Sequence, residues 1–430
     1  MKKDNLAKLV LCAAAALLPG LGPNARAQSA PAKTDPQNVG YAFGLEIGSL
    51  LKKQAIEVEP DFVGKGISTI LAYGTPWLTS AQVSNVLVTL PLAPKEVVGG
   101  DKYFKNTKEE VGYALGLYFG RNVRSHEPRT DVPSLVAAIK DTLSGAKLAM
   151  TTNEEHAIFD AEQARQTAEL KKQGEANATD GPAFLEKNKS TPGITVLTNG
   201  LQYQILTKGA GAIPDRYDKV SVNYRGSLMS GELFDASDPG ETVTFPLTRV
   251  IKGWTQILEM MPTGSKWKVF IPADLAYGAK IRPPLIAPNS PLIFDIELVK
   301  IEPPDANETF LQKNSTQPGV KVLDDGLQYK VITQGTGAKP MLADTVEANY
   351  RGTLIDGTEF DASAAGKPAS FNVSGVIPGW TEILQLMPVG SKWQVTIPDY
   401  LGYGERGFPP KIKPNALLIF DIELVSIRKP

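Results

Sequence analysis

A long internal repeat governs how this chain can fold. The stretch NYRGSLMSGELFDAS at Asn223–Ser237 returns as NYRGTLIDGTEFDAS at Asn349–Ser363. Residues 184–300 align with residues 310–426 without a gap, and both copies end in LIFDIELV. Two copies of so long a unit indicate tandem domains rather than a solenoid, because each unit is long enough to bury its own core.

Each copy is predicted to be an α+β domain. Residues 200–206 and 266–271 alternate between apolar and polar side chains, as strands do, and Pro-Gly, Asn-Gly and Ser-Gly pairs separate such runs. Residues 253–261 instead follow helical spacing, and Pro262 and Gly264 are expected to end that helix. The apolar positions of this helix are Trp254, Ile257, Leu258 and Met261. We therefore expect a sheet of about five strands with one short helix on it.

The N-terminal half carries a second, weaker repeat. VGYAFGLEIG at Val39–Gly48 is echoed by VGYALGLYFG at Val111–Gly120. An amphipathic stretch follows each, and third helices are expected to begin near Thr79 and Thr152, the latter ending at Gly181-Pro182. We interpret residues 36–95 and 106–183 as two all-α modules, each too small to bury its faces alone.

The first residues are predicted to be a cleavable signal peptide. Basic residues precede an apolar run over residues 9–22, and Ala25-Arg26-Ala27 resembles a cleavage site, which places the signal peptide at residues 1–27. A helix of the mature fold is the less favoured alternative. The single cysteine, Cys12, lies in that run, so export would leave a chain without thiol or disulfide chemistry. The expected location is the periplasm.

Composition excludes several kinds of function. The net charge of −1 gives no sign of nucleic acid binding, and 42% hydrophobic with 21% charged residues is typical of a globular protein. Both histidines, His126 and His156, lie outside the duplicated half, which therefore has no Ser-His-Asp triad and lacks the usual zinc ligands. No phosphate-binding glycine motif is present. We expect no cofactor and no metal.

Four motifs in each copy resemble the FKBP family of prolyl isomerases. They are NYRG…FDAS, then VIKGW (VIPGW in the second copy), then IPADLAYG (IPDYLGYG), then LIFDIEL. The N-terminal modules resemble the helical dimerisation domain of Mip-like and FkpA-like periplasmic members. The resemblance implies isomerase domains at residues 184–303 and 304–430, each an antiparallel half-barrel sheet around a short helix.

The resemblance also implies which residues form an apolar cup that grips proline. In the first copy these are Tyr224, Phe234, Asp235, Val250, Ile251, Trp254, Tyr277, Ile286 and Phe294. In the second copy they are Tyr350, Phe360, Asp361, Val376, Ile377, Trp380, Tyr403, Ile412 and Phe420. We assign the Tyr277 and Tyr403 hydroxyls and the Ile251 and Ile377 N–H groups as donors to a substrate carbonyl. The two aspartates would lie at the rim, near the twisting carbonyl or holding the tyrosines.

Elementary physics agrees with this assignment. An X-Pro bond isomerises over a barrier of roughly 18–20 kcal/mol. The twisted amide has lost resonance and is less dipolar, so a dry pocket favours it relative to water. Aromatic walls supply the dryness, and no acid, base or nucleophile is needed.

Taken one at a time, these residues could have purely structural roles. Any one aromatic side chain here is more often plain core, as we interpret Trp267 and Trp393, and Asp235 could be a turn residue. The duplicated set as a whole favours catalysis. A non-catalytic holdase chaperone and a proline-motif binding protein remain the alternatives.

Two departures from the family pattern distinguish the copies. Val243 and Ala369 replace another aromatic of the cup, and Lys411 stands where the first copy has Leu285. A charge at an apolar rim costs desolvation unless it reaches water. We therefore expect the first domain to be the more general catalyst, and the second to be weaker or to prefer acidic flanking residues.

The expected partners are unfolded or partly folded exported polypeptides with X-Pro bonds. No nucleic acid and no membrane span are expected. Modules 36–95 and 106–175 are predicted to pair within one chain as a pseudo-dimer, the alternative being a swapped homodimer.

Overall fold

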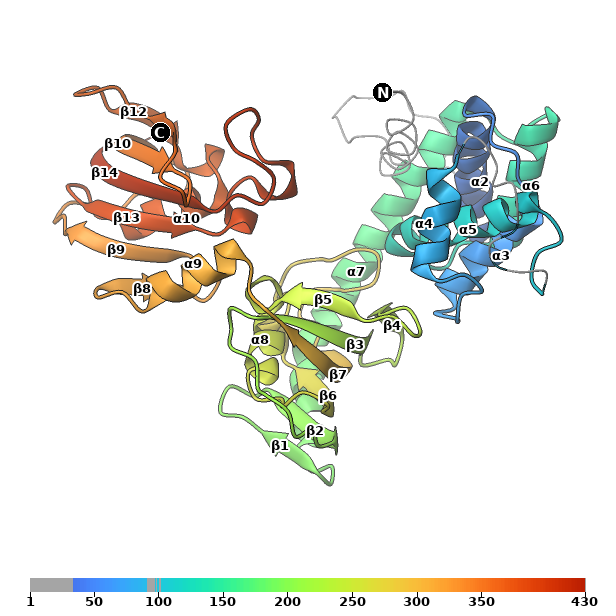
Figure 1. The fold of residues 1–430 in the computed structure, drawn as a ribbon, viewed down its shortest axis with the longest axis horizontal. Helices are drawn as coiled ribbons and strands as arrows, with labels where there is room; N and C mark the ends of the chain where they lie inside the picture. Colours follow the sequence, from blue (N-terminus) through green and yellow to red (C-terminus); the bar gives the residue numbers. More distant parts are fainter. Residues whose placement is uncertain (1–33, 91–96, 98, 100–101, 430) are drawn as a thin grey trace. The chain divides into compact units, whose positions relative to one another are not determined.

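The described chain begins with a set of helices (Figure 1). A computed structural model describes residues 34–90, 97, 99 and 102–429, so the predicted signal peptide lies outside the described residues. The helices of this first part are α2 (Pro36–Lys53), α3 (Pro60–Leu71), α4 (Ser80–Val88), α5 (Thr107–His126), α6 (Val132–Ser144) and α7 (Thr152–Asn188). None of the described helices is long and apolar enough to cross a membrane.

Polar side chains fix where these helices begin. The Thr79 hydroxyl caps α4 and the Thr151 hydroxyl caps α7, each in a reciprocal capping box with the residue three positions on. Asp35 and Asp131 accept backbone N–H bonds at the starts of α2 and α6. The third helices therefore begin where the sequence predicted.

The two helical modules interlock. Helix α2 of the first repeat packs on α6 of the second, and α3 packs on α5. The repeated glycines allow this close approach: a Cβ atom at Gly44 would lie 2.2 Å from the Leu135 carbonyl oxygen, and one at Gly116 would lie 2.2 Å from that of Val63. One apolar core, including Phe43 of α2, therefore draws on both repeats.

The prediction that Gly181-Pro182 ends the last helix was wrong. Helix α7 continues through Pro182 to Asn188. A proline inside a helix costs about 3 kcal/mol, but the turn beyond it is held from outside. The Phe184 ring contacts the Phe270 ring at 6.2 Å, and Gln202 Nε2 donates to the Leu185 carbonyl oxygen at 2.8 Å.

Two antiparallel sheets follow, one for each copy of the long repeat. The first contains β1 (Ile194–Val196), β2 (Gln202–Thr207), β3 (Lys219–Ser227), β4 (Leu233–Ala236), β5 (Val243–Pro246), β6 (Lys266–Ile271) and β7 (Leu292–Glu302), with helix α8 (Lys252–Leu258). The second contains β8 (Val320–Val322), β9 (Gln328–Thr333), β10 (Thr345–Thr353), β11 (Glu359–Ala362), β12 (Ala369–Asn372), β13 (Lys392–Ile397) and β14 (Leu418–Arg428), with helix α10 (Pro378–Leu386). Figure 1 shows the second sheet with α10 against it.

Both sheets have the same strand order and more strands than predicted. The orders are β1-β2-β6-β7-β3-β4 and β8-β9-β13-β14-β10-β11, with β5 and β12 pairing β3 and β10. Each sheet is seven-stranded rather than about five. The additional strands are only three or four residues long, too short for alternation to reveal them.

Each short helix buries the face that the sequence predicted. Trp254 of α8 is 4% exposed, and Ile257 and Leu258 are fully buried. The helix ends at Leu258 rather than at Met261 as predicted, although Met261 is fully buried as well. Helix α9 (Ala306–Ser315), which precedes the second sheet, was not predicted. Its start is a capping box of Asp305 and Glu308, a pattern visible in the sequence.

Two carboxyl groups of the helical part, those of Glu46 and Glu155, have pKa values well above the usual range. Burial raises the pKa of Glu46 to about 8, and the charge of Glu155 adds to the shift. Burial alone raises the pKa of Glu155 to about 7. Both groups therefore bind a proton more tightly in the folded than in the unfolded chain, so stability is lost as the pH rises towards these values.

We predict that Glu46→Gln removes part of this pH dependence. The unfolded Glu46 loses its proton near pH 4.5, whereas the folded one keeps it to about pH 8. The wild type should therefore lose about 1–3 kcal/mol relative to the variant between those values. Thermal unfolding of both proteins at pH 5 and pH 8.5 measures this. An equal change of Tm in the two proteins would contradict it.

Candidate active site

The second copy gathers four aromatic rings into one cluster, which we refer to as its cup. Tyr350 comes from β10, Phe360 from β11, Trp380 from α10 and Phe420 from β14. The Trp380 and Phe420 rings meet edge to face at 5.2 Å, as do those of Tyr350 and Trp380 at 5.4 Å and of Phe360 and Phe420 at 5.4 Å. The other apolar residues predicted for this cup belong to the same cluster: Val376, Ile377, Tyr403 and Ile412.

A glycine of the repeated motif lets two cup rings approach each other. Gly352 of β10 lies opposite Asp361 of β11 and Phe420 of β14. A Cβ atom at this position would lie 2.6 Å from the Phe360 ring and 2.8 Å from the Phe420 ring. Gly226 stands in the same relation to two rings of the first copy. The glycine of NYRG is therefore required by the rings that close the cup.

Each predicted aspartate holds the tyrosine of its own cup. The Tyr350 hydroxyl donates to Asp361 Oδ2 at 2.6 Å, and the Tyr224 hydroxyl donates to Asp235 Oδ2 at 2.6 Å. Burial, together with the neighbouring carboxylate, raises the pKa of both tyrosines far above the usual range. Both phenols therefore stay protonated at any working pH and fix their rings in the cup wall.

The structure shows the predicted residues of the first copy in two groups. The Phe234 and Phe294 rings meet edge to face at 5.5 Å, and a cavity of about 550 Å³ is lined by Phe234, Asp235, Tyr277 and Ile286. The second group comprises Val250 and Ile251, which directly precede α8, and Trp254 within it. The Trp254 ring meets the Phe245 ring at 5.8 Å.

The tyrosines assigned as donors keep their hydroxyls available. Among the described residues, neither the Tyr277 nor the Tyr403 hydroxyl has a hydrogen-bond partner. Burial raises the pKa of both. The Tyr277 ring lies 5.0 Å from the Arg282 guanidinium, and the Tyr403 ring 5.3 Å from the Phe408 ring.

Helix starts supply a second kind of donor. Ile251 is the N-cap of α8 and Ile377 is the N-cap of α10. Within the described part of the chain, no acceptor is found for either N–H group. An N–H at a helix start carries partial positive charge, so it suits a carbonyl oxygen.

One cup residue escaped the sequence reasoning. The Phe371 ring of β12 meets Trp380 at 5.2 Å and Tyr350 at 5.5 Å. Its strand is only four residues long, too short for alternation to reveal it. Phe371 lies on the same strand face as Ala369, where an aromatic was expected and is missing. Phe371 therefore partly replaces that aromatic.

The charge at the rim of the second cup is accommodated. The Lys411 ammonium donates to the Phe360 carbonyl oxygen at 2.7 Å, while the neighbouring Ile412 is only 3% exposed. The lysine thus ties the loop before the last strand to β11 and keeps a polar partner.

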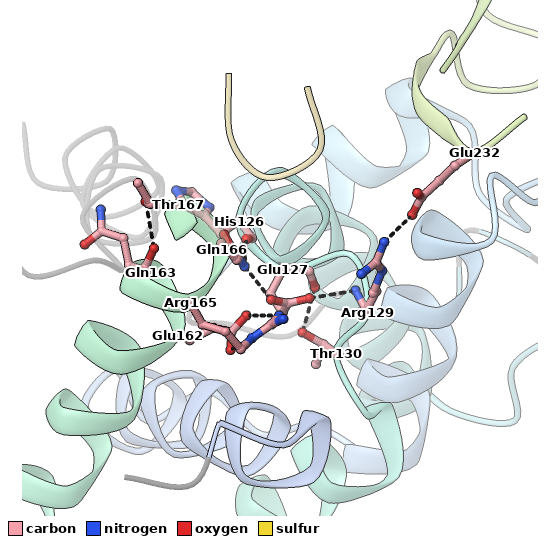
Figure 2. Close-up of polar contacts among 10 residues, drawn as sticks. All are labelled: His126, Glu127, Arg129, Thr130, Glu162, Gln163, Arg165, Gln166, Thr167 and Glu232. Carbon is pink, nitrogen blue, oxygen red and sulfur yellow. Dashed lines mark hydrogen bonds and ion pairs between the residues drawn. The ribbon is translucent and has the colours of Figure 1, made fainter. Parts of the chain in front are cut away.

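Ion pairs hold the segment that carries Phe234 and Asp235. Arg121 pairs with Asp238 at 2.7 Å, and Arg129 pairs with Glu232 at 2.9 Å, the latter visible in Figure 2. Arg121 and Arg124 of α5 also line the cavity of the first copy. The sequence analysis missed these arginines, because no local sequence pattern indicates that α5 lies beside the segment that carries Phe234 and Asp235.

The described residues contain no group of three or more His, Cys, Asp or Glu side chains that could hold a metal ion. The second copy combines an apolar cluster of rings with hydroxyl and N–H donors at its edge, which suits a neutral amide next to a ring. In the first copy, arginines as well as aromatic side chains line the cavity.

Comparisons with known proteins agree with this class of site. A family profile described as FKBP-type peptidyl-prolyl cis-trans isomerase matches residues 211–299 and 337–425. A second, described as the domain amino terminal to FKBP-type peptidyl-prolyl isomerase, matches residues 108–205 and 301–331.

Several curated proteins are similar over part of the chain. The outer membrane protein MIP of Legionella longbeachae is 40% identical over 200 residues, 45% of this chain and 86% of that protein. The FKBP-type 22 kDa peptidyl-prolyl cis-trans isomerase of Escherichia coli K12 is 54% identical over 119 residues, 27% of this chain and 58% of that protein. FkpA of the same organism is 35% identical over 212 residues, 46% of this chain and 78% of that protein. The chain belongs to the family of FKBP-type peptidyl-prolyl cis-trans isomerases.

We predict that the two kinds of buried tryptophan behave differently. Trp254→Leu with Trp380→Leu should lower kcat/KM at least fivefold, because the wall of each cup is opened to water. Trp267→Leu with Trp393→Leu is the matched control, since these side chains are equally buried at 4% exposure. Each single change should cost about 2–4 kcal/mol of stability. Equal losses of activity in the two double variants, assayed well below Tm, would contradict the assignment.

Proposed function

We propose that each cup catalyses X-Pro isomerisation by binding the twisted amide better than the planar one. The observation that carries the proposal is the aromatic cluster of the second copy, in which the rings of Tyr350, Trp380 and Phe420 pack against one another and the Tyr350 hydroxyl donates to Asp361. A planar amide loses its hydration on entering such a cup, whereas the less dipolar twisted amide loses less. Each 1.4 kcal/mol of that difference gives about tenfold in rate.

The donors act on the carbonyl oxygens beside the proline. The Tyr403 hydroxyl and the Ile377 N–H have no acceptor within the described residues and lie at the edge of the same apolar cluster. In the first copy, Tyr277 and Ile251 take the same roles. These groups orient the peptide so that one carbonyl can rotate while its neighbour stays anchored.

The first domain is proposed as the more general catalyst. Its rim carries Leu285 where the second domain has Lys411. The bond from Lys411 to the Phe360 carbonyl reduces the cost of that charge but still places an ammonium beside the cup. Equal turnover of neutral peptides by the two cups would contradict this ranking.

We propose that the protein is exported to the periplasm and also acts as a chaperone there. The basic, apolar and A-x-A segments over residues 1–27 support a cleavable signal peptide and a periplasmic location. The interlocked helices support a pseudo-dimer within one chain, so we propose a monomer. Two cups on one chain raise the effective concentration of each at an unfolded client, which supports a chaperone role. A light-scattering mass of twice 46.3 kDa would contradict the monomer.

We predict that Tyr277→Phe and Tyr403→Phe each remove one cup's hydroxyl donor. A hydrogen bond is worth about 0.5–1.5 kcal/mol net, so the affected cup should slow about two- to tenfold. The double variant of the full chain should be slower than either single variant on an Ala-Xaa-Pro-Phe peptide.

Tyr329→Phe is the matched control, because this tyrosine stacks on Trp393 rather than joining the cup rings. Unchanged kcat/KM in the double variant would remove the hydroxyls from the mechanism. If the wild-type chain has no isomerase activity, the cups would instead be sites that bind peptides without catalysis.

A further inference from the structure

The first and second isomerase domains share an interface that reaches the binding edge of both cups. Segments 205–222, 243–267 and 297–430 form one compact unit. Within it, Arg249 Nη2 lies 2.8 Å from Asp399 Oδ1, and the Arg249 guanidinium lies over the Tyr400 ring at 5.9 Å. Lys252 pairs with Asp324 at 2.8 Å.

This interface has a small apolar centre as well. The Tyr217 side chain of the first domain is 5% exposed and clusters with Leu311 and Leu417. Its hydroxyl accepts a hydrogen bond from Gln328 Nε2 at 3.2 Å, and Gln328 is fully buried. An apolar centre beside a charged pair is the usual anatomy of a specific interface.

The position of the ion pair connects it to both sites. Arg249 directly precedes Val250 and Ile251, whose N–H group we assign to the first cup. Asp399 begins the short turn that leads to Tyr403, the hydroxyl donor of the second cup, and its carbonyl oxygen accepts the Gly402 N–H at 2.9 Å. The pair thus joins the two loops to which we assign substrate contacts.

The partners of this pair depend on each other. The Asp399 side chain is 5% exposed and that of Arg249 is 29% exposed. Burial raises the pKa of Asp399, and the Arg249 charge opposes that rise. Removing either partner from such a pair leaves a charge without compensation in a poorly hydrated place, so the surrounding loop must move.

The sequence repeat gives independent support, because the copies differ where this interface lies. Arg249 and Lys252 of the first copy correspond to Gly375 and Pro378 of the second. Asp399 and Asp324 of the second copy correspond to Ala273 and Thr198 of the first. Tyr217 corresponds to Ala343.

These differences make the interface asymmetric. The first copy carries the cations and the second carries the carboxylates, while the four counterpart positions in the other copy hold uncharged residues. Head-to-tail contacts can repeat from one unit to the next. Here the contact can form only once, because the counterpart positions in the other copy lack the charged partners.

We propose that Arg249 and Asp399 are positioning residues through which each isomerase domain holds the substrate-binding loop of the other. The two cups are then coupled: peptide bound in one cup changes the affinity of the other cup for peptide, and the factor is the same in both directions. This inference rests on the proposed roles of Ile251 and Tyr403.

The test replaces each residue by its counterpart from the other copy, in the full-length chain. Arg249→Gly and Asp399→Ala are made separately in two backgrounds: Trp254→Leu, which leaves mainly the second cup, and Trp380→Leu, which leaves mainly the first. Arg249→Gly should lower kcat/KM of the second cup about fivefold, although the change lies in the first domain. Asp399→Ala should do the same to the first cup, and the exchanged pair Arg249→Asp with Asp399→Arg should recover at least half of the loss.

The matched control is Arg428→Gly, which breaks an exposed ion pair with Glu347 inside the second sheet. It should leave kcat/KM of both cups unchanged. If Arg249→Gly lowers only Tm and leaves the second cup at full activity, the pair is merely structural and the proposal is overturned.

Hydrogen exchange separates this proposal from the proposed catalysis. In Arg249→Gly, amides 399–404 should exchange faster than in the wild type, whether or not the cups are active. Unchanged exchange there would overturn the proposal even if catalysis is present. If the amides of Arg249→Gly exchange faster than those of the wild type but the wild type has no isomerase activity, only the proposed function is overturned.

Discussion

Every part of each cup depends on keeping water away from one amide bond. The barrier to X-Pro rotation comes from resonance, and hydration of the planar form raises it. Side chains without charge can lower it only if they replace water on all sides. We propose that the rings of Tyr350, Trp380 and Phe420 exclude water in the second copy. They pack edge to face around Trp380, which lies on the buried face of α10. The glycine at position 352 is part of the same requirement, because a side chain there would separate two of the rings.

The residues proposed for the cup could be selected from the sequence because they lie in compact motifs that occur twice, and those of the second copy lie in or against one apolar cluster. Local patterns also located the starts of α4 and α7 and the buried face of α8. Other features depend on partners far along the chain. Gln202 and Phe270 contact the last turn of α7, beyond Pro182, and no local pattern shows these contacts. Phe371 was missed because its strand is only four residues long.

The two copies have the same set of cup residues, but the residues around each cup differ. The pairing of Arg249 with Asp399 needs one residue from each copy, and each residue is replaced in the other copy. The helical repeats differ in a related way, since α2 packs on α6 and α3 on α5, so neither repeat is complete without the other. In both halves of the chain, the two copies of the repeat therefore contact each other, and they do so through different residues.

The central claim is that catalysis proceeds by desolvation, without proton transfer. A pH–rate profile of the wild type, with the solvent isotope effect measured alongside, tests it most directly. The pKa values of Tyr224, Tyr277, Tyr350 and Tyr403 are all raised, so none of them should titrate. The account predicts a level kcat/KM from about pH 6 to pH 9 and an isotope effect near unity. A bell-shaped profile with a substantial isotope effect would show an acid or base at work and contradict it.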